Sequence, residues 1–397
     1  MQALEQWVNS SNNAIEISLV KANEILNEEN KIDYLKKNSF HPSFSYPLFG
    51  FEEKIYGYKN LKIQLFYCSG SLDTYFHIDY DQKIDPEKIK NTIELPINIT
   101  AIPPAEDVKS KILPHLKESY TSSLDEFLHL VEIKAKTFKP YGEKVSEYRL
   151  ENEDDSIVYE YYKCSLNTPE FKKYHRRLQL FLLWTIEGAS YIDETDKKWI
   201  IYTLYQKVNT GEYVTYNLVG YCTCYPFYVY PDKIKMRISQ FLIMPPYQRK
   251  RHGEKLYQKL YEIYSQDKQI ACINVEDPNE NFSDMRDIID LRLLLSTNIF
   301  DNLEAPVPVY HPILLKIQND YKFSKRQSHR YLEIMLLKKL QSNDPKKVKK
   351  YRLQVKRRIF KQNYDVISQM EKNERYEKLE ETYQSLINEY KYLLSKI

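Results

Sequence analysis

The spacing of apolar residues changes along the chain and predicts three successive regions. Up to residue 160, short alternations such as LKIQLFYCSG predict strands, and the spacing in LDEFLHLVEIKAK predicts a helix. Between residues 161 and 318, helical and strand-like segments follow one another in a regular order. From residue 319 the chain is highly charged and shows the Glu/Lys pairing of exposed helices. We predict an N-terminal α+β domain (1–160), an α/β core (161–318) and a helical, basic extension (319–397).

The central region has the most informative order of segments. The run RRLQLFLLWTIEGAS has helical spacing, and two strand-like runs flank NTG (209–211), which is a hairpin signal. The apolar run RISQFLIM predicts a buried strand that stops at Pro245 and Pro246, because proline cannot serve in a central ladder. A basic loop, YQRKRH, then leads into an amphipathic helix, GEKLYQKLYEIYS. QIACINV predicts a further strand, with Glu276 at its end.

Composition is that of a globular protein, with 42% hydrophobic and 28% charged residues. The N-terminus lacks the basic and apolar segments of a signal peptide, and the most apolar run, 178–192, is too short to span a bilayer. The five cysteines are too few and too scattered for a disulfide framework, and they form no pair of CxxC motifs. Cys222 and Cys224 alternate in a strand-like run, which favours two side chains on one strand face over metal ligation. We expect a soluble protein of the cytoplasm and nucleus, with no membrane attachment and no metal.

The charge is unevenly distributed. The net charge is +3, but residues 338–361 contain eleven basic residues and one acidic residue, so the rest of the chain is net acidic. An acidic body suits a cationic partner such as a lysine-rich peptide better than it suits DNA. The basic segment is typical of a solvated helix face or an import signal, with contact to DNA phosphates as the alternative. We therefore expect no direct DNA binding.

The strand, loop and helix between residues 240 and 264 could hold a phosphate. The first N–H groups of a helix lack intrahelical partners, and the helix dipole adds positive charge there. Gly253 would let a ligand approach the backbone, and Arg249, Lys250 and Arg251 would add charge-assisted contacts. For the basic triplet taken alone, a solvated turn or a localisation signal is the more common explanation. Neither needs a buried strand before the loop and an amphipathic helix after it, so we favour a phosphate-binding loop.

Two acidic positions are candidates for proton transfer. Glu187 is the only charged residue between Arg177 and Asp193, in a largely apolar run, so we expect it to be partly buried in a helix. Burial raises the pKa of a carboxyl group towards the range useful for proton transfer, although a structural pairing with an arginine is an equal alternative. Glu276 and Asp277 follow a predicted strand, where ligands of α/β sheets gather. A simple Glu-Asp-Pro turn is the alternative there.

The loop QRKRHG resembles the Q/R-x-x-G-x-G/A acyl-CoA loop of the GNAT acetyltransferase superfamily. More narrowly, RLQLFLLWTIEGASYIDETD, VGYCTCYPFYVYPDK, RISQFLIMPPYQ and INVEDPNENFSDMRD are similar to segments of type B histone acetyltransferase catalytic subunits. GYKNLKI and YRLQVKRR are similar as well, so only about the last forty residues fall outside the resemblance. The resemblance implies an α/β fold with a GNAT acyl-CoA acyltransferase core, in which helices flank a mixed sheet.

The resemblance also implies a histone acetyltransferase that transfers acetyl from acetyl-CoA to lysines in the N-terminal tail of free histone H4. Glu276 would be the general base, with Glu187 and Asp277 as supporting carboxylates. The residues expected to bind acetyl-CoA are Phe241, Leu242, Ile243, Gln248, Arg249, Lys250, Arg251, His252, Gly253, Glu254 and Asn279. The residues expected to contact the histone tail are Glu52, Glu53, Tyr225, Pro226 and Phe227. A β-propeller (WD-repeat) histone chaperone is the implied partner.

The expected chemistry is direct acyl transfer. A lysine ammonium group, with a pKa of about 10.4, must lose a proton to a carboxylate before it can attack the thioester. Backbone donors along Phe241–Ile243 would hold the thioester and polarise its carbonyl group. Cys272 is disfavoured as a nucleophile because nothing pairs it with a histidine. Two other functions stay open: a GNAT enzyme for another amine, and a catalytically weak or silent protein that binds histones or nucleic acid.

One position departs from the superfamily pattern. Arg251 stands where the loop's first glycine is expected. If that position needs a positive φ, a side chain there costs about 1–3 kcal/mol. We therefore predict a weaker or altered grip on the cofactor, which Arg251 could offset by meeting a phosphate.

Overall fold

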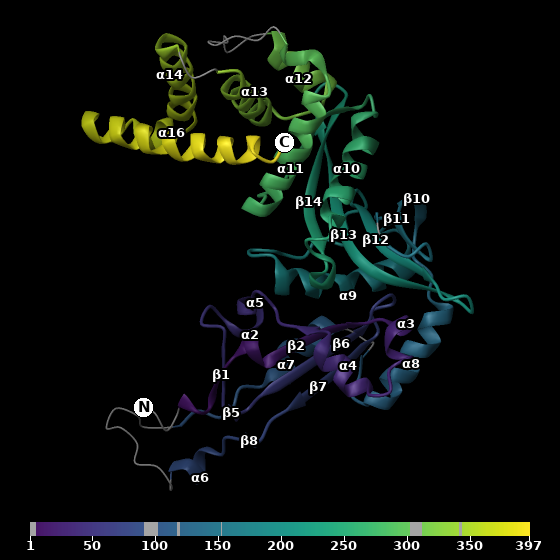
Figure 1. Cartoon of the computed structure of the whole chain (residues 1–397). Helices are drawn as coiled ribbons and strands as arrows, with labels where there is room; N and C mark the ends of the chain where they lie inside the picture. The colour runs from purple at the N-terminus through teal and green to yellow at the C-terminus, as the bar shows by residue number, and fades with distance from the viewer. Residues whose placement is uncertain (1–4, 91–101, 117–119, 152, 302–311, 341–343) are drawn as a thin grey trace. The chain divides into compact units, whose positions relative to one another are not determined.

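The computed structural model describes residues 5–90, 102–116, 120–151, 153–301, 312–340 and 344–397 (Figure 1). The chain forms two compact units. The first comprises Met1–Cys224 and Gln240–Lys250, and the second comprises Tyr225–Ser239 and Arg251–Ile397. This grouping differs from three consecutive domains, because two long strands, β13 (Val214–Val229) and β14 (Lys233–Ile243), each contribute residues to both units.

The N-terminal part of the first unit is a mixed sheet covered by helices. Its elements are β1 (Val8–Ser10), α2 (Ser11–Ala14), β2 (Ile15–Val20), α3 (Ala22–Ile25), α4 (Lys31–Lys37), β3 (Ser39–Phe40), α5 (Tyr46–Phe49), β4 (Lys54–Tyr56), β5 (Tyr58–Lys59), β6 (Lys62–Cys68), β7 (Thr74–Asp79), β8 (Gln82–Lys83), α6 (Pro86–Lys90), α7 (Val108–Leu116), β9 (Tyr120–Thr121) and α8 (Leu124–Thr137). The main sheet has the order β3-β2-β6-β7-β9, with β2 and β6 parallel and β6 and β7 antiparallel. α8 packs Phe127 and Val131 into the core on this sheet, so the predicted strand at 61–70 and the helix after it are confirmed.

A second, six-stranded sheet has the order β10-β11-β12-β13-β14-β15. Its elements, with the helix that interrupts them, are β10 (Glu143–Tyr148), β11 (Ile157–Ser165), α9 (Pro169–Thr185), β12 (Ile200–Asn209), β13, β14 and β15 (Ile270–Val275). β12 and β13 form the expected hairpin, in which Asn209 pairs with Val214 and Gly211 has a φ of 87°. β14 and β15 are parallel, and α10 (His252–Ser265) connects them. The mixed sheet with flanking helices is the fold that the sequence predicted.

The rest of the second unit is helical. Its elements are α10, α11 (Glu280–Leu295), η2 (Asn298–Phe300), α12 (Pro312–Asp320), α13 (Lys325–Lys339), α14 (Pro345–Gln362), α15 (Tyr364–Ile367) and α16 (Lys372–Leu394). Leu291, Tyr331, Tyr351 and Tyr390 bring α11, α13, α14 and α16 into one apolar core. α16, yellow in Figure 1, therefore packs on the other helices through its apolar face.

Three further findings concern the cysteines, the groups that could hold a metal ion, and the helices. All five cysteines are free thiols, and Cys222 and Cys224 lie buried on β13 with their Sγ atoms 3.7 Å apart. In the described part of the chain, no cluster of His, Cys, Asp or Glu side chains has the arrangement of a metal site. No described helix combines the length and the apolar character needed to cross a membrane.

Candidate active site

The C-terminal end of β14 is held by a close approach to β13. At Gly220 of β13 a Cβ atom would lie 2.4 Å from the carbonyl oxygen of Leu242, so only glycine fits there. The Met244 amide donates to the carbonyl of Val219 at 2.9 Å. Within the described residues, the ladder between β14 and β15 ends at the pair Ile238–Val275, before the segment of Phe241, Leu242 and Ile243. Leu242 and Ile243 are buried, whereas Phe241 is half-buried.

The loop after β14 is closed by its own side chains. β14 ends at Ile243, so the prediction that the strand stops at the proline pair is confirmed, and a short 3₁₀ helix, Pro245–Tyr247, begins the loop. Gln248 donates through Nε2 to the carbonyl of Ile243 at 2.8 Å, and Lys250 donates through Nζ to the carbonyl of Pro246 at 2.9 Å. Arg249 is exposed and has a φ of 59°. The Lys250 side chain thus folds back on the loop, whereas the Arg249 side chain does not.

Arg251 is the N-cap of α10 and has a left-handed backbone, with φ of 68° and ψ of 4°. The position that glycine was expected to fill therefore does require a positive φ. The Arg251 guanidinium binds the Glu254 carboxylate, with Nε–Oε2 at 3.0 Å and Nη2–Oε1 at 3.3 Å. His252 is buried as the first residue of the helix, and Gly253 is the second. The helix N-terminus thus presents backbone donors beside an arginine that Glu254 partly neutralises.

Glu276 follows β15 and is held from two sides. Its amide donates to the carbonyl of Ile238 at 2.9 Å, which continues the pairing of β15 with β14. Arg237 donates through Nη1 to Oε1 of Glu276 at 2.9 Å, and the Ser239 hydroxyl donates to Oε2. The Glu276 side chain is 40% exposed, so solvent still reaches the carboxylate. This arrangement orients a carboxylate at the end of a strand while leaving it accessible to a substrate.

Arg237 also joins Glu276 to the aromatic run at the end of β13. Its guanidinium carbon lies 4.2 Å from the centre of the Phe227 ring, and the Phe227 and Tyr225 rings are 4.7 Å apart. Tyr225 and Pro226 are half-buried, and Phe227 is at the edge of exposure. Aromatic faces of this kind bind the aliphatic stem and the charged head of a lysine side chain.

The sequence did not single out Arg237 or Ser239. The available signal was their spacing: they are two residues apart in a strand, so they share one face, and a charged residue interrupts an otherwise apolar run. Their partner lies on a different strand, which the spacing alone does not identify.

The prediction that Glu187 is partly buried in a helix was wrong. α9 ends at Thr185, and Glu187 is exposed in the following turn, where Gly188 has a φ of 69°. The chain leaves the helical direction at Ile186, where φ is −120° and ψ is 119°, so Glu187 lies beyond the helix. Glu187 is therefore a solvent-exposed acid rather than a buried one, and its supporting role in catalysis stays a prediction.

The remaining acidic and polar candidates differ in availability. Asp277 is exposed and has a φ of 33°, and Asn279 is the N-cap of α11, accepting from the Phe282 amide at 2.9 Å. Glu52 is exposed beside Lys54. The Glu53 carboxylate, unlike that of Glu52, already has several hydrogen-bond partners within the protein. Its Oε1 accepts from the Ser45 amide at 2.6 Å and the Tyr46 amide at 3.1 Å, and its Oε2 accepts from Asn12.

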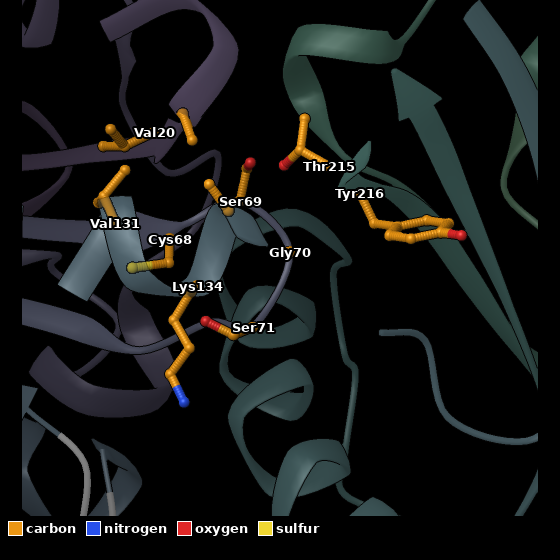
Figure 2. A pocket seen from close by; sticks show the side chains of 11 residues that line it. Val20, Cys68, Ser69, Gly70, Ser71, Val131, Lys134, Thr215 and Tyr216 are labelled. Carbon is orange, nitrogen blue, oxygen red and sulfur yellow. The ribbon is translucent and has the colours of Figure 1, made fainter. Parts of the chain in front are cut away.

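A small cavity elsewhere in the first unit is too small for a cofactor. Its volume is about 10 Å³, which is the space of a single water molecule. Figure 2 shows Cys68, Ser69, Ser71 and Lys134 around it. Burial raises the pKa of the Cys68 thiol, so this thiol stays protonated and inert.

Comparison with known families agrees with this geometry. The family "Acetyltransferase (GNAT) family" matches residues 164–282, which include β14, the basic loop and Glu276. The chain is therefore an acetyltransferase of the GNAT class. "Histone acetyl transferase HAT1 N-terminus" matches residues 7–187, and "Fungal HAT1, C-terminal" matches residues 287–341.

Full-length relatives make the assignment narrower. A histone acetyltransferase type B catalytic subunit from Cryptococcus neoformans is 36% identical, over 99% of this chain and 98% of the relative. The proteins of that name from Kluyveromyces lactis and Homo sapiens are 34% and 30% identical, each over 99% of this chain and over 93% and 94% of their own lengths. The chain belongs to the family of type B histone acetyltransferase catalytic subunits.

Among solved structures, an aminoglycoside acetyltransferase from an uncultured soil metagenomic sample matches 40% of this chain, at 17% identity and a TM-score of 0.24.

Proposed function

We propose that this protein transfers the acetyl group of acetyl-CoA to lysine side chains in the N-terminal tail of free, newly synthesised histone H4. The observation that carries the mechanism is the orientation of Glu276 by Arg237 and Ser239, with the Arg237 guanidinium lying over the Phe227 ring. An accessible carboxylate with fixed geometry beside an aromatic surface suits the deprotonation of a lysine. The names of the relatives support a histone as the acceptor.

The residues around the basic loop fit the phosphates of acetyl-CoA. The positive φ values at Arg249 and Arg251 turn the chain so that α10 starts with its N–H groups at the loop. Arg249 is exposed, and the Arg251 side chain is 59% exposed, so its guanidinium is accessible to a phosphate although its partner Glu254 is only 18% exposed. Gln248 and Lys250 act by closing the loop. Phe241–Ile243 would supply the backbone donors for the thioester.

The proposed reaction needs no nucleophile from the protein. The Glu276 carboxylate accepts a proton from the lysine ammonium group, directly or through water. The neutral amine forms a bond to the acetyl carbon, the C–S bond breaks, and the CoA thiolate takes up the proton that the nitrogen loses as it becomes an amide. Arg237 and Ser239 keep the Glu276 carboxylate in position, and Cys272 takes no part, since burial raises the pKa of its thiol.

The test is an acetyl-transfer assay with labelled acetyl-CoA and four acceptors: free H4, an H4 tail peptide, nucleosomes and a polyamine. Free H4 and its tail are expected to be the preferred acceptors. Glu276→Gln should lower kcat by about 100-fold or more, since it removes the proton acceptor and preserves shape. Glu262→Gln, at an exposed position of α10, is the matched control and should leave kcat unchanged.

Each alternative gives a distinct result in this assay. Full activity of Glu276→Gln would exclude Glu276 as the base. Preference for the polyamine would indicate a GNAT enzyme for another amine, and binding of H4 without transfer would indicate a silent histone-binding protein.

Recognition of the tail is proposed to use Tyr225, Pro226, Phe227 and Glu52. Next to Glu52, Phe51 is 94% exposed and stacks on Tyr46 with ring centres 5.8 Å apart. An exposed aromatic beside an acidic side chain suits a lysine-rich segment. Glu53 would act by shaping this loop, because backbone amides and Asn12 occupy its carboxylate.

The resemblance to the family also supports a WD-repeat β-propeller histone chaperone as partner, and action in both cytoplasm and nucleus. Purification of the tagged protein from each cell fraction, followed by identification of bound proteins, tests both proposals. Recovery from one compartment alone, or without a β-propeller protein, would contradict the corresponding proposal.

A further inference from the structure

The second unit contains a groove that shares only Asp277 with the residues proposed for acetyl transfer. Its volume is about 1180 Å³, and it is lined by β15, by the first turns of α11 and α13, and by α14 and α16. These helices are the green to yellow elements of Figure 1. The groove begins at Asp277 and Pro278 and reaches Gln362 of α14 and Leu386 of α16. Its size is that of a site for a large ligand or a short peptide rather than for a single ion.

Several of the basic side chains that line the groove are already neutralised. Arg330 binds Asp287 at 2.7 Å and also binds Glu389 at 2.5 Å. Arg358 binds Glu333 through two hydrogen bonds of 2.7 Å. These pairs fix the walls of the groove and add little net charge to it.

Three other basic residues leave the groove with a positive surplus. Lys235 on β14 and Lys325 and Arg326 in the first turn of α13 all line the groove. Within the described residues none of the three forms an ion pair, and Lys325 and Arg326 are exposed. Among the acidic residues of the lining, Asp287 and Glu389 are bound to Arg330, which leaves Asp277. The first turn of α13 adds partial positive charge to the same wall.

The lining is also apolar to a large extent. Val229, Val275, Ile359 and Leu386 stand between the charged positions. A phosphodiester backbone offers no apolar groups to such a surface, whereas a peptide offers both side-chain types. Nucleic acid would find a better match on the outer side of α14, where Lys346, Lys347, Lys349 and Lys350 are exposed and do not line the groove.

We propose that this groove binds a partner protein through an acidic peptide segment that also carries apolar side chains. The carboxylates would meet Lys235, Lys325 and Arg326, and the apolar side chains would lie against Val229, Val275 and Leu386. Lys235, Lys325 and Arg326 are not among the residues proposed for acetyl transfer, so peptide binding and acetyl transfer can each fail without the other.

The experiment measures the binding of a fluorescein-labelled peptide of alternating glutamate and leucine to the full-length protein by anisotropy at low ionic strength. The double variant Lys325→Glu/Arg326→Glu should weaken binding about ten-fold or more, because it reverses two charges in the groove. It should fold normally, since acidic residues in the first turn of a helix are favourable. The matched control is Lys346→Glu/Lys347→Glu, the same charge change at exposed positions of α14, and it should change affinity less than about two-fold.

Cys272 offers a second readout inside the groove. It lines the groove and is half-buried, whereas the other four cysteines are buried. Saturating acidic peptide should slow the reaction of Cys272 with a thiol reagent, and Cys272→Ser should abolish the signal. A peptide of alternating lysine and leucine should neither bind nor protect.

Three results would overturn the proposal. The first is equal loss of binding in the two charge-reversal variants, which would mean a general charge effect. The second is binding without protection of Cys272. The third is displacement of the peptide by a short DNA duplex whose affinity falls in the Lys325→Glu/Arg326→Glu variant. That result would assign the groove to nucleic acid.

Discussion

Arg251 accepts a backbone conformation that glycine adopts more readily, with a φ of 68°. The cost of this conformation for a side chain is about 1–2 kcal/mol. In this conformation Arg251 places a guanidinium group at the start of α10, where it binds Glu254. A phosphate group can accept the same bidentate, charge-assisted hydrogen bonds from arginine as a carboxylate does. The strain therefore has a functional explanation if Arg251 exchanges Glu254 for a cofactor phosphate.

Arg251→Gly should weaken acetyl-CoA binding about three- to ten-fold, because it removes a charge-assisted contact. The free energy of unfolding should change by less than about 1 kcal/mol, since relief of strain offsets the greater freedom of glycine in the unfolded chain. Calorimetric titration and denaturant unfolding measure the two quantities. Lys322→Gly is the matched control, because it removes a basic side chain at a φ of 56° outside the loop. Equal effects of the two variants, or unchanged affinity, would remove a specific role for Arg251.

The two acidic candidates show what local patterns can predict at this scale. Glu276 was placed correctly at the end of a strand, because an apolar run followed by Glu-Asp-Pro has few other interpretations. Glu187 was misplaced, because apolar spacing continues through Trp184 and gives no sign of where the helix ends. The glycine that follows was the signal that deserved more weight.

At the scale of elements, a buried polar network joins α10, α11 and α13. Asp290 of α11 accepts from the hydroxyl of Tyr257 at 3.0 Å and from the hydroxyl of Tyr331 at 2.6 Å. Desolvation dominates over these hydrogen bonds and raises the pKa of Asp290 to about 7. The neighbouring Asp287 is held as a partner of Arg330. The three helices thus share one acid that is largely protonated below neutral pH.

This raised pKa predicts a pH-dependent stability. An unfolded Asp ionises at about pH 4, whereas Asp290 in the folded chain ionises at about pH 7. Its stabilising contribution is therefore complete below pH 4, falls as the pH rises to about 7, and is constant above that. Asp290→Asn cannot titrate, so its stability relative to the parent should improve steadily between pH 5 and about 7.

Denaturant unfolding of the parent and of Asp290→Asn at several pH values measures this effect. Asp365→Asn, at an exposed position of α15, should run parallel to the parent at every pH. Parallel curves for Asp290→Asn and the parent would show that Asp290 is ionised in the folded protein.

At the scale of the whole molecule, the chain ends in a helix that belongs to a core. Tyr390 and Leu393 of α16 are fully buried in the apolar cluster with α11, α13 and α14. The charged composition of the last residues gave no reason to expect this, because exposed faces dominate their sequence. All buried residues of this cluster lie in the second unit.

Tyr390→Ala should destabilise the second unit by about 3–5 kcal/mol, because it leaves a cavity and removes a hydroxyl that binds Glu333. Hydrogen exchange should accelerate in α11, α13 and α14 and stay unchanged in the β3-β2-β6-β7-β9 sheet. Tyr392→Ala is the control in the same helix, since that ring is 49% exposed. Acceleration in both places would show that the two units unfold together.

The sequence by itself determined the order of strands and helices in the centre of the chain, the loop between β14 and α10, and the position of Glu276. These features depend on residues close together in the chain, where apolar period, proline and glycine act directly. Only the tertiary structure decided that Arg237 and Ser239 hold Glu276, that Arg358 binds Glu333, and that α16 completes a core. Such contacts join residues far apart in the chain, so they depend on strand register and helix packing, which no local pattern encodes.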